Sequence, residues 1–355
     1  MVEYAHKGGI APARKRRRPS RAERHDNHSS ALRRSAERTR AARTALEAVL
    51  EQPDARLDEE LRKGAQYLAQ RLTPAAGAIP RIPGIDICGV TLPLNGVAGG
   101  DLITYVDFQH RFDLDARIRS AVSSGREGMA RILQKLKYTA GILVADVAGH
   151  DFSDAARAAM LHQAFHTGAL YEMDLNGQIT ARLFEQINTR FCKSSTLRNL
   201  AADRDEASYI TLIYGEISST GRFSFICAGH PQPLVFSREF DHFVEVSQDR
   251  LISYPPIGLQ PGEHDVDAKR YERALGYKKN YTVNNLNLMG HGDVLLLYTD
   301  GLIEPLSAYT QVQLAHAVSQ ARDDSAQRIC EAIVRDRQAT VPQTDDLTLV
   351  VIKYR

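Results

Sequence analysis

After residue 84 the chain is a succession of short β-branched or aliphatic runs separated by turn residues, and this pattern constrains the fold more than any other feature. Helical apolar spacing predicts helices at 154–173, 179–191 and 311–337. Because the strand signals adjoin one another in sequence and helices flank them, an α+β sandwich is favoured over a doubly wound parallel sheet. The predicted strands are 85–92, 141–147, 208–217, 222–228, 233–236, 293–299 and 347–354.

The first 30 residues are rich in Arg, Lys, His, Ser and Pro and nearly lack large aliphatic side chains, which predicts a disordered basic arm. Residues 1–45 contain 13 Lys/Arg and 4 Asp/Glu, against 32 and 39 in the remainder. The arm therefore carries about +9 and the body about −7. Two interpretations follow: the arm contacts an anionic partner, such as nucleic acid, a membrane surface or an acidic protein face, or it is a solvated tail.

Residues 31–78 are predicted to form a helical regulatory or dimerisation segment with a linker. Pro53 divides the segment into two helices, and four leucines recur on one helical face: Leu57, Leu61, Leu68 and Leu72. This stripe packs either on the body of its own chain or against a second copy, so a homodimer through 31–72 is one of two interpretations. Residues 79–355 form the main domain, within which the charged stretch 109–140 is interpreted as an insertion.

The cysteines and the hydropathy favour a cytoplasmic protein. The four cysteines are far apart and lack the close spacing of a structural zinc site. No apolar run approaches the roughly 20 residues that span a bilayer, and the basic N-terminus has no apolar signal-peptide core. Reduced thiols and no transmembrane segment are expected.

Four aspartates lie at the ends of strand signals or beside glycine: Asp101, Asp146, Asp300 and Asp345. A carboxylate at a strand end is held rigidly and projects beyond the sheet. Several carboxylates converging there would repel one another unless cations lay between them. Hard oxygen ligands without a Cys/His set indicate Mg²⁺ or Mn²⁺ rather than zinc.

Residues 79–355 resemble the SpoIIE-like branch of the PPM family, the metal-dependent phosphatases related to protein phosphatase 2C. The landmarks appear in family order: Ile82-Pro83-Gly84-Ile85, Val97-Ala98-Gly99-Gly100-Asp101, Ala145-Asp146-Val147-Ala148-Gly149-His150, Tyr209-Ile210-Thr211-Leu212, Ala228-Gly229-His230-Pro231-Gln232-Pro233-Leu234, Pro256-Ile257-Gly258-Leu259, Tyr298-Thr299-Asp300-Gly301-Leu302-Ile303-Glu304 and Asp345-Asp346-Leu347-Thr348-Leu349. The resemblance implies an αββα sandwich of two stacked antiparallel sheets flanked by helices, with a binuclear metal site at one edge.

The resemblance also implies roles for individual residues. Asp146 would bridge two Mn²⁺ or Mg²⁺ ions, with the backbone carbonyl of Val147 as a further ligand. Asp300 and Asp345 would complete the shell of one metal, and Asp101 would act on the other side, partly through water. Gly99, Gly100 and Gly301 would let the backbone turn tightly and leave space for ions and phosphate.

Three nearby residues leave alternatives open. Asp346 follows Asp345 directly, so in an extended segment only one of the two side chains can face the metals; Asp345 is chosen and Asp346 is the alternative. His150 either protonates the leaving serine or threonine oxygen or has a structural role. His230 is interpreted as a turn-stabilising residue.

The chain also departs from the family pattern. Thr104 stands where a further aspartate is usual, and Asp107 comes too late to replace it. Asp151 stands where a glycine commonly follows the Gly-His pair, and the stretch from Asp101 to Asp146 is longer than usual.

The function implied by the resemblance is a metal-dependent protein serine/threonine phosphatase of bacterial signalling. It would hydrolyse a phosphoprotein, such as an anti-sigma-factor antagonist, through a metal-activated water. Alternatives are a catalytically silent phosphoprotein-binding module, a nucleic-acid-binding protein and a cysteine phosphatase. The last rests on the Cys-x5-Arg spacing of Cys192 and Arg198, whose intervening loop has no glycine.

Overall fold

The computed structural model describes residues 55–72, 74, 78–94, 98–148, 152–193, 209–246, 251–267, 276–287, 290–303 and 308–355. The chain divides into two units, Met1–Leu61 and Arg62–Arg355. The sheets and the site described below belong to the second unit. Among the described residues, no helix combines the length and the apolar character needed to cross a membrane.

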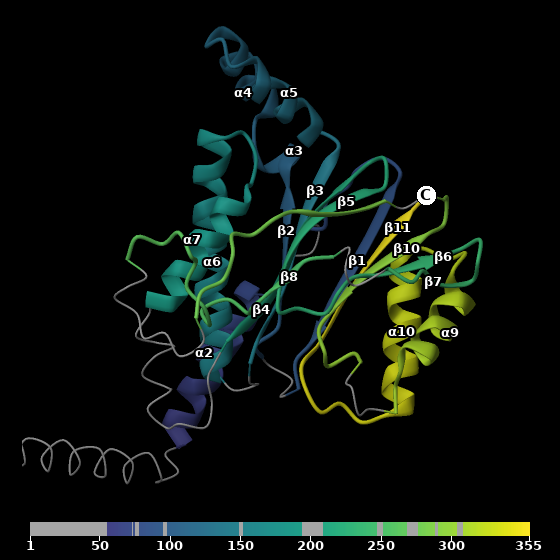
Figure 1. Ribbon diagram of the computed structural model, residues 1–355. Coiled ribbons are helices and arrows are strands. Elements are labelled where there is room, and N and C mark those ends of the chain that lie inside the picture. Colours follow the sequence, from purple (N-terminus) through teal and green to yellow (C-terminus); the bar gives the residue numbers. More distant parts are fainter. Residues whose placement is uncertain are drawn as a thin grey trace, which may run out of the picture. The chain divides into compact units, whose positions relative to one another are not determined.

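Two sheets form the centre of the second unit (Figure 1). The first has the spatial order β1 (Ile85–Leu92), β11 (Leu347–Tyr354), β10 (Val294–Tyr298), β6 (Leu234–Ser237) and β7 (His242–Phe243), all antiparallel. The second has the order β2 (Leu102–Asp107), β3 (Thr139–Val147), β4 (Ile210–Ser218), β5 (Arg222–Ala228) and β8 (Ser253–Tyr254), and β9 (Asn284–Asn287) also pairs with β5. Only β8 is parallel to its neighbour among these described pairs.

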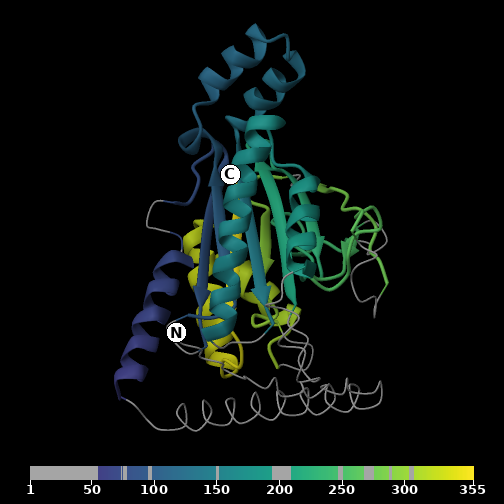
Figure 2. The ribbon, with the colours of Figure 1, turned by 90° about the vertical axis from the view of Figure 1, so that its left-hand side faces the viewer.

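Helices cover the outer faces of both sheets (Figures 1 and 2). The second sheet packs against α6 (Phe152–Leu175) and α7 (Ala181–Lys193), and the first against α9 (Gln311–Ala321) and α10 (Ala326–Thr340). Alternate side chains of both sheets meet in the middle, where Ile103, Ile142 and Val350 are almost fully buried. The predicted α+β sandwich of two stacked sheets flanked by helices is therefore confirmed.

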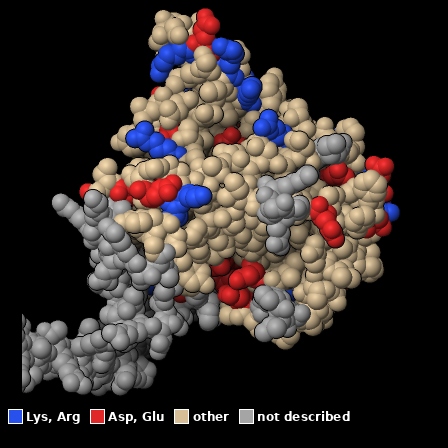
Figure 3. All heavy atoms as spheres, viewed as in Figure 1, with Lys and Arg blue, Asp and Glu red and all other residues tan. Residues whose placement is uncertain are grey.

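The stretch 109–140 lies between two antiparallel partners, β2 and β3, and folds as helices. They are α3 (Phe108–Arg111), α4 (Leu114–Ser123) and α5 (Glu127–Leu136). In Figures 1 and 2, α4 and α5 extend beyond the sheets, and Figure 3 shows Lys and Arg side chains gathered over them. They leave the sandwich at the end of β2, whereas Asp101 lies before its start.

Several predicted elements agree with the structure at both ends, namely β1, β5 and β11. The strand at 102–107 was not predicted, and the single helix predicted at 311–337 is two helices. The break falls at 322–325, where the side chain of Ser325 accepts from the amide of Arg328 and begins α10.

The N-terminal predictions are only partly within the described residues. Residues 1–54 lie outside them. Helix α2 (Ala55–Leu72) begins two residues after Pro53, and Leu72 is buried against the second unit's helical core. The division into an arm, a regulatory segment and a catalytic domain stays a prediction.

Candidate metal centre

Asp101 lies just before β2, and Asp146 lies in the neighbouring strand β3 of the second sheet. Leu102 pairs with Ala145, and the amide of Val147 donates to the carbonyl of Gly100 at 3.3 Å. This antiparallel register places Asp101 opposite Asp146. Two like charges in direct cross-strand positions destabilise a sheet unless something compensates them.

Asp300 and Asp345 come from the first sheet. Tyr298 at the end of β10 pairs with Leu349 near the start of β11, so the residues before β11 and after β10 share one edge. The two sheets are joined there, because the hydroxyl of Thr299 donates to Oδ2 of Asp101 at 2.8 Å. Figure 3 shows acidic side chains gathered at the lower edge of this face, near the ends of the strands.

The pKa values of the two second-sheet aspartates show that these charges act on one another. Burial raises the pKa of Asp146 to about 7, and the negative charges of Asp300, Asp345, Asp346 and Asp154 add to the rise. Burial also raises the pKa of Asp101 well above its usual value, with the charge of Asp146 as the next cause. The structure thus brings all four predicted aspartates into one electrostatic neighbourhood.

Asp346 is bound by backbone amides. Its two carboxylate oxygens accept from the amides of Leu94 and Gly100, each at 2.7 Å, and the side chain is buried. This carboxylate therefore fixes the loop that leads into Asp101. Asp345 is half-buried, and its Oδ1 accepts from the amide of Asp346 at 2.8 Å. The choice of Asp345 as the metal ligand stays a prediction.

Two glycines are required by the close approach of Asp346. A Cβ atom on Gly99 would lie 1.8 Å from Oδ2 of Asp346, and one on Gly301 would lie 2.0 Å from its carbonyl oxygen. Neither glycine has a positive φ. The space expected for ions and phosphate at these two positions is occupied by Asp346 itself.

Arg337 holds the loop that follows Asp300. This residue of α10 is 1% exposed, and its guanidinium donates to the carbonyls of Leu302 at 3.1 Å and Gly301 at 3.3 Å. It also donates to the carbonyl of Val341 at 2.9 Å. This role could not be predicted from the sequence, because a buried arginine in the last turn of a helix has the same sequence pattern as a solvated one.

Asp154 is a second residue that sequence analysis missed. It lies in the first turn of α6, is buried, and forms an ion pair with Arg157. Its charge contributes to the raised pKa of Asp146. An acidic residue is common in the first turn of a helix, because it interacts favourably with the helix dipole. Asp154 therefore could not be distinguished from a surface aspartate by sequence pattern.

The remaining predicted residues have separate outcomes. His150 lies outside the described residues, and Val147 is the buried last residue of β3. His230 follows β5, and Oγ1 of Thr211 lies 2.9 Å from its Nδ1. Burial lowers the pKa of His230 to about 3, so the ring is neutral. The turn-stabilising role of His230 stays a prediction.

Thr104 and Asp107 do not replace a missing ligand. Thr104 is buried within β2. Asp107 is the last residue of that strand, where it caps α3 by accepting a hydrogen bond from the amide of His110 at 3.1 Å. Neither residue therefore supplies the carboxylate that the family pattern has at this point of the chain.

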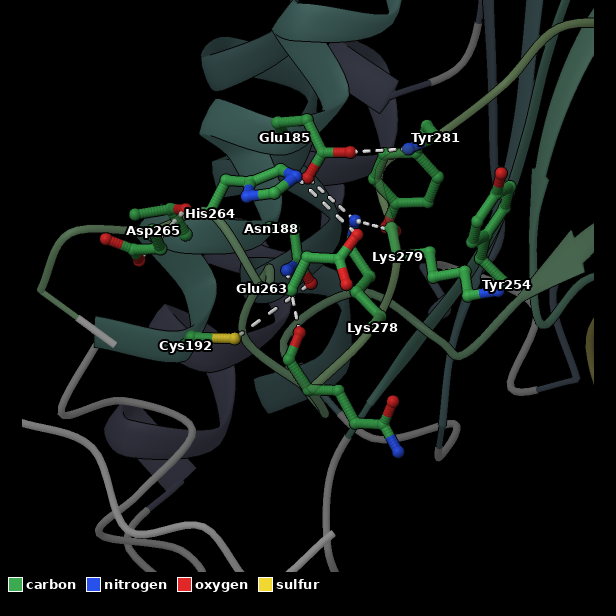
Figure 4. Close-up of polar contacts among 12 residues, drawn as sticks. Glu185, Asn188, Cys192, Tyr254, Glu263, His264, Asp265, Lys278, Lys279 and Tyr281 are labelled. Atoms are coloured by element: carbon green, nitrogen blue, oxygen red, sulfur yellow. Dashed lines mark hydrogen bonds and ion pairs between the residues drawn. The ribbon is translucent and has the colours of Figure 1, made fainter. Parts of the chain in front are cut away.

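A polar network fixes the segment that carries Pro256-Ile257-Gly258-Leu259 (Figure 4). The side chain of Asn188 on α7 accepts from the amide of Gly258 at 2.9 Å and donates to the carbonyl of Gln260 at 2.8 Å. Ile257 in turn exchanges backbone hydrogen bonds with Ile210. The network thus supports the start of β4, beside Thr211, which pairs with Asp146.

A later segment of the chain is attached to α7 by an ion pair whose lysine side chain is buried. Nζ of Lys278 lies 2.7 Å from Oε2 of Glu185 and 3.5 Å from the ring centroid of Tyr281 (Figure 4). Oε1 of Glu185 accepts from the amide of Tyr281 at 2.6 Å. These contacts attach Lys278 and Tyr281 to α7.

The donor set fits a divalent cation in its chemistry. Carboxylates are the ligands that Mg²⁺ and Mn²⁺ prefer, and a cation would relieve the repulsion that raises the pKa of Asp146. Among the described residues, no three His, Cys, Asp or Glu side chains are yet close enough to hold a metal ion together. Joint binding of a cation by these side chains would therefore require them to converge further.

The cysteine-phosphatase alternative gains no support from the described part of that motif. Cys192 is buried near the end of α7, and its Sγ lies 3.9 Å from Oδ1 of Asn188. Arg198 lies outside the described residues.

Comparisons with known proteins agree with the fold. The family model for stage II sporulation protein E (SpoIIE) matches residues 137–355, which are 219 of the 355 residues and include Asp146, Asp300 and Asp345. No curated protein matches the chain.

Three solved structures are similar to this chain at low sequence identity, and the first two of them share its fold. The SiaA-PP2C domain of Pseudomonas aeruginosa is 14% identical, with a TM-score of 0.53; the match covers 85% of this chain and 98% of that one. The PP2C phosphatase domain of SpoIIE from Bacillus subtilis, solved with a fragment of its regulatory domain, is 14% identical, with a TM-score of 0.50 and coverage of 76% and 63%. The RsbU and RsbW domains of Rv1364c from Mycobacterium tuberculosis are 20% identical, with a TM-score of 0.49 and coverage of 78% and 61%.

This chain thus spans about three-fifths of the last two structures, 63% and 61% of their lengths. The family match covers more than half of the chain and contains three of the four aspartates predicted as site residues. The chain belongs to the SpoIIE-like branch of the PPM phosphatases.

Proposed function

We propose that this chain is a metal-dependent protein serine/threonine phosphatase that acts on a phosphoprotein in bacterial signalling. The observation that carries the proposal is the strand pairing that brings Asp146, Asp300 and Asp345 to one edge of the sheets within the family match. The charges of Asp300 and Asp345 there help to raise the pKa of Asp146. Carboxylates that repel one another at the end of two sheets are suited to a cationic cofactor and a phosphate anion.

Asp101, Asp146, Asp300 and Asp345 would hold Mn²⁺ or Mg²⁺, with two ions and the carbonyl of Val147 as the family resemblance implies. Bound ions would supply charge neutralisation at the phosphate and would acidify the attacking water. His150 is the proposed proton donor to the leaving oxygen.

The surrounding residues hold these aspartates in place. Asp346 binds the amide of Gly100 and thereby fixes the approach to Asp101. Arg337 binds the carbonyls of Gly301 and Leu302 and thereby fixes the loop after Asp300. Both loops are thus held by buried charged groups, which limits the rearrangement needed when a cation binds.

The proposed substrate is phosphoserine or phosphothreonine on a partner protein, with an anti-sigma-factor antagonist as the candidate from the family resemblance. The proposal also includes a cytoplasmic location, a homodimer through residues 31–72 and an anionic partner for residues 1–30. Sedimentation of the full chain tests the homodimer, and a monomer at all working concentrations would contradict it.

The proposal is tested by phosphate release from phosphoserine and phosphothreonine peptides, with and without Mn²⁺. The intact chain is compared with Asp146→Asn and Asp300→Asn, and with Asp323→Asn as a matched change at an exposed aspartate. We expect Mn²⁺-dependent release by the intact chain and by the Asp323 variant, and a loss of at least about 100-fold in the other two. If both site variants kept full activity, the assignment of the site would be wrong.

The same assay separates the phosphatase from the silent module. A chain that binds the phosphopeptide but releases no phosphate with Mn²⁺ or Mg²⁺ would be a phosphoprotein-binding regulator.

A further inference from the structure

A pair of histidines on α6 lies apart from the aspartate cluster. His162 and His166 are one helical turn apart, and their Nε2 atoms are 3.0 Å from each other. The ring centroids are 4.3 Å apart and the planes are nearly perpendicular, at 83°. Side chains at positions i and i+4 share one face of a helix, so the spacing of the sequence produces this approach directly.

The pair lies at the border of the buried face of α6. Leu161 and Phe165, which precede the two histidines, are fully buried, whereas both imidazoles are half-buried. Nδ1 of His166 is buried and has no hydrogen-bond partner among the described residues. The polar contact described for this ring is therefore its contact with His162.

Both rings are neutral at neutral pH. Burial lowers the pKa of His166 to about 3, with the charges of Arg111 and His162 as further causes. Burial and the charge of Arg111 also lower the pKa of His162. A neutral imidazole has one nitrogen with a free lone pair, and this is the form that binds metals. Both Nε2 atoms offer that lone pair when each ring carries its proton on Nδ1.

The separation of the two nitrogen atoms suits a shared cation. With metal–nitrogen bonds of about 2.05 Å, nitrogens 3.0 Å apart subtend an angle of about 94° at the metal. This angle is near that of octahedral or square-planar coordination and below the tetrahedral value. We propose that His162 and His166 form a two-nitrogen chelate site for a borderline divalent cation (Ni²⁺, Cu²⁺ or Zn²⁺), completed by water.

Ligand chemistry separates this site from the aspartate cluster. Imidazole suits Ni²⁺, Cu²⁺ and Zn²⁺, whereas carboxylates suit Mg²⁺ and Mn²⁺. Asp154, whose charge reaches Asp146, precedes His162 by eight residues, which is about 12 Å along the helix. The two sites can therefore be filled by different ions, and the proposal does not depend on phosphatase activity.

Occupation of the histidine site would link two successive turns of α6. That helix packs against the sheet that contains β3, whose residue Asp146 belongs to the aspartate cluster. Binding of a cation to the folded helix therefore stabilises the unit as a whole. Arg111 should weaken cation binding, because its positive charge lies close enough to lower the pKa of both rings and would repel a bound cation.

The test uses the full chain in saturating Mg²⁺, titrated with Ni²⁺ and, separately, Cu²⁺. The chain contains 12 histidines, so the readout is the difference from His162→Gln. We expect the variant to bind one equivalent less of Ni²⁺ and to lose a rise in Tm of about 2 °C or more that Ni²⁺ gives the intact chain. The electron paramagnetic resonance spectrum of the Cu²⁺ complex should lose its two-nitrogen component.

Two further variants sharpen the test. His316→Gln changes a histidine on α9 whose Nε2 contacts Gln320, and should leave Ni²⁺ binding as in the intact chain. Arg111→Gln should tighten binding, because it removes the opposing charge. Equal binding by the intact chain and His162→Gln, or no Ni²⁺ binding by the intact chain, would overturn the proposal.

Discussion

Replacing Asp146 by asparagine should stabilise the metal-free protein at alkaline pH while it abolishes hydrolysis. The pKa of Asp146 rises from 3.8 to about 7 in the folded chain, so between these values the folded state binds more protons than the unfolded state. Stability from this group is fully present below pH 3.8 and is lost as the pH rises through about 7.

The size of the effect follows from the shift. About 3 pKa units at 1.36 kcal/mol each give an upper limit of about 4 kcal/mol. Asp146 is partly exposed, and solvent screens the charges around it, so about 1–3 kcal/mol is the expected gain for Asp146→Asn at pH 8. At pH 5 the carboxyl is mostly protonated and the gain should be small.

Urea unfolding in the presence of a chelator measures this difference at pH 5 and pH 8. Asp323→Asn is the control with the opposite sign, because the ion pair with Arg238 lowers the pKa of Asp323. Addition of Mn²⁺ at pH 8 should reverse the order and stabilise the intact chain more than Asp146→Asn. Equal or lower stability of the metal-free variant at pH 8 would refute the argument that these carboxylates repel one another.

Three further predictions concern the residues that hold the site. Gly301→Ala should lower the free energy of unfolding by about 1–3 kcal/mol and reduce phosphatase activity, because the alanine Cβ would overlap the carbonyl oxygen of Asp346. Urea unfolding and phosphate release measure the two effects. Arg337→Lys should cost about 2–4 kcal/mol in urea unfolding, because a single ammonium cannot satisfy the carbonyls that the guanidinium binds. Thr299→Val should weaken Mn²⁺ binding in a calorimetric titration, with a stability cost of about 1–3 kcal/mol, because Asp101 loses its hydroxyl donor.

Each of these has a contradicting result. Full activity of Gly301→Ala would mean that the loop before β11 accommodates a methyl group. Unchanged stability of Arg337→Lys would mean that water replaces the lost hydrogen bonds. Unchanged Mn²⁺ affinity of Thr299→Val would mean that Asp101 does not belong to the metal centre.

The strands could be predicted where the sequence alone determines burial. Runs such as 85–92 and 347–354 are apolar and bounded by turn residues, and they became β1 and β11 without change. The run 102–107 is equally apolar, but it lies between a glycine pair and a charged stretch, and its pairing partner β3 follows only after α3, α4 and α5. Pairing across such a stretch is a tertiary property that local pattern does not contain.

The candidate site divides in the same way. Carboxylates at strand ends could be found from the sequence, because strand boundaries and residue type suffice to identify them. The roles of Asp346 and Arg337 could not, since they depend on which backbone amides and carbonyls lie within reach after the two sheets stack. His162 and His166 had the right spacing for a shared face, but their exposure follows from how α6 packs.

The most direct test of the central claim is Mn²⁺ binding, followed by the loss of the free-ion electron paramagnetic resonance signal. The intact chain is compared with four single variants: Asp101→Asn, Asp146→Asn, Asp300→Asn and Asp345→Asn. If these carboxylates act together on divalent cations, the intact chain binds Mn²⁺ and every variant binds it at least about tenfold more weakly, with Asp146→Asn the weakest. Equal affinity in the intact chain and all four variants would contradict the account.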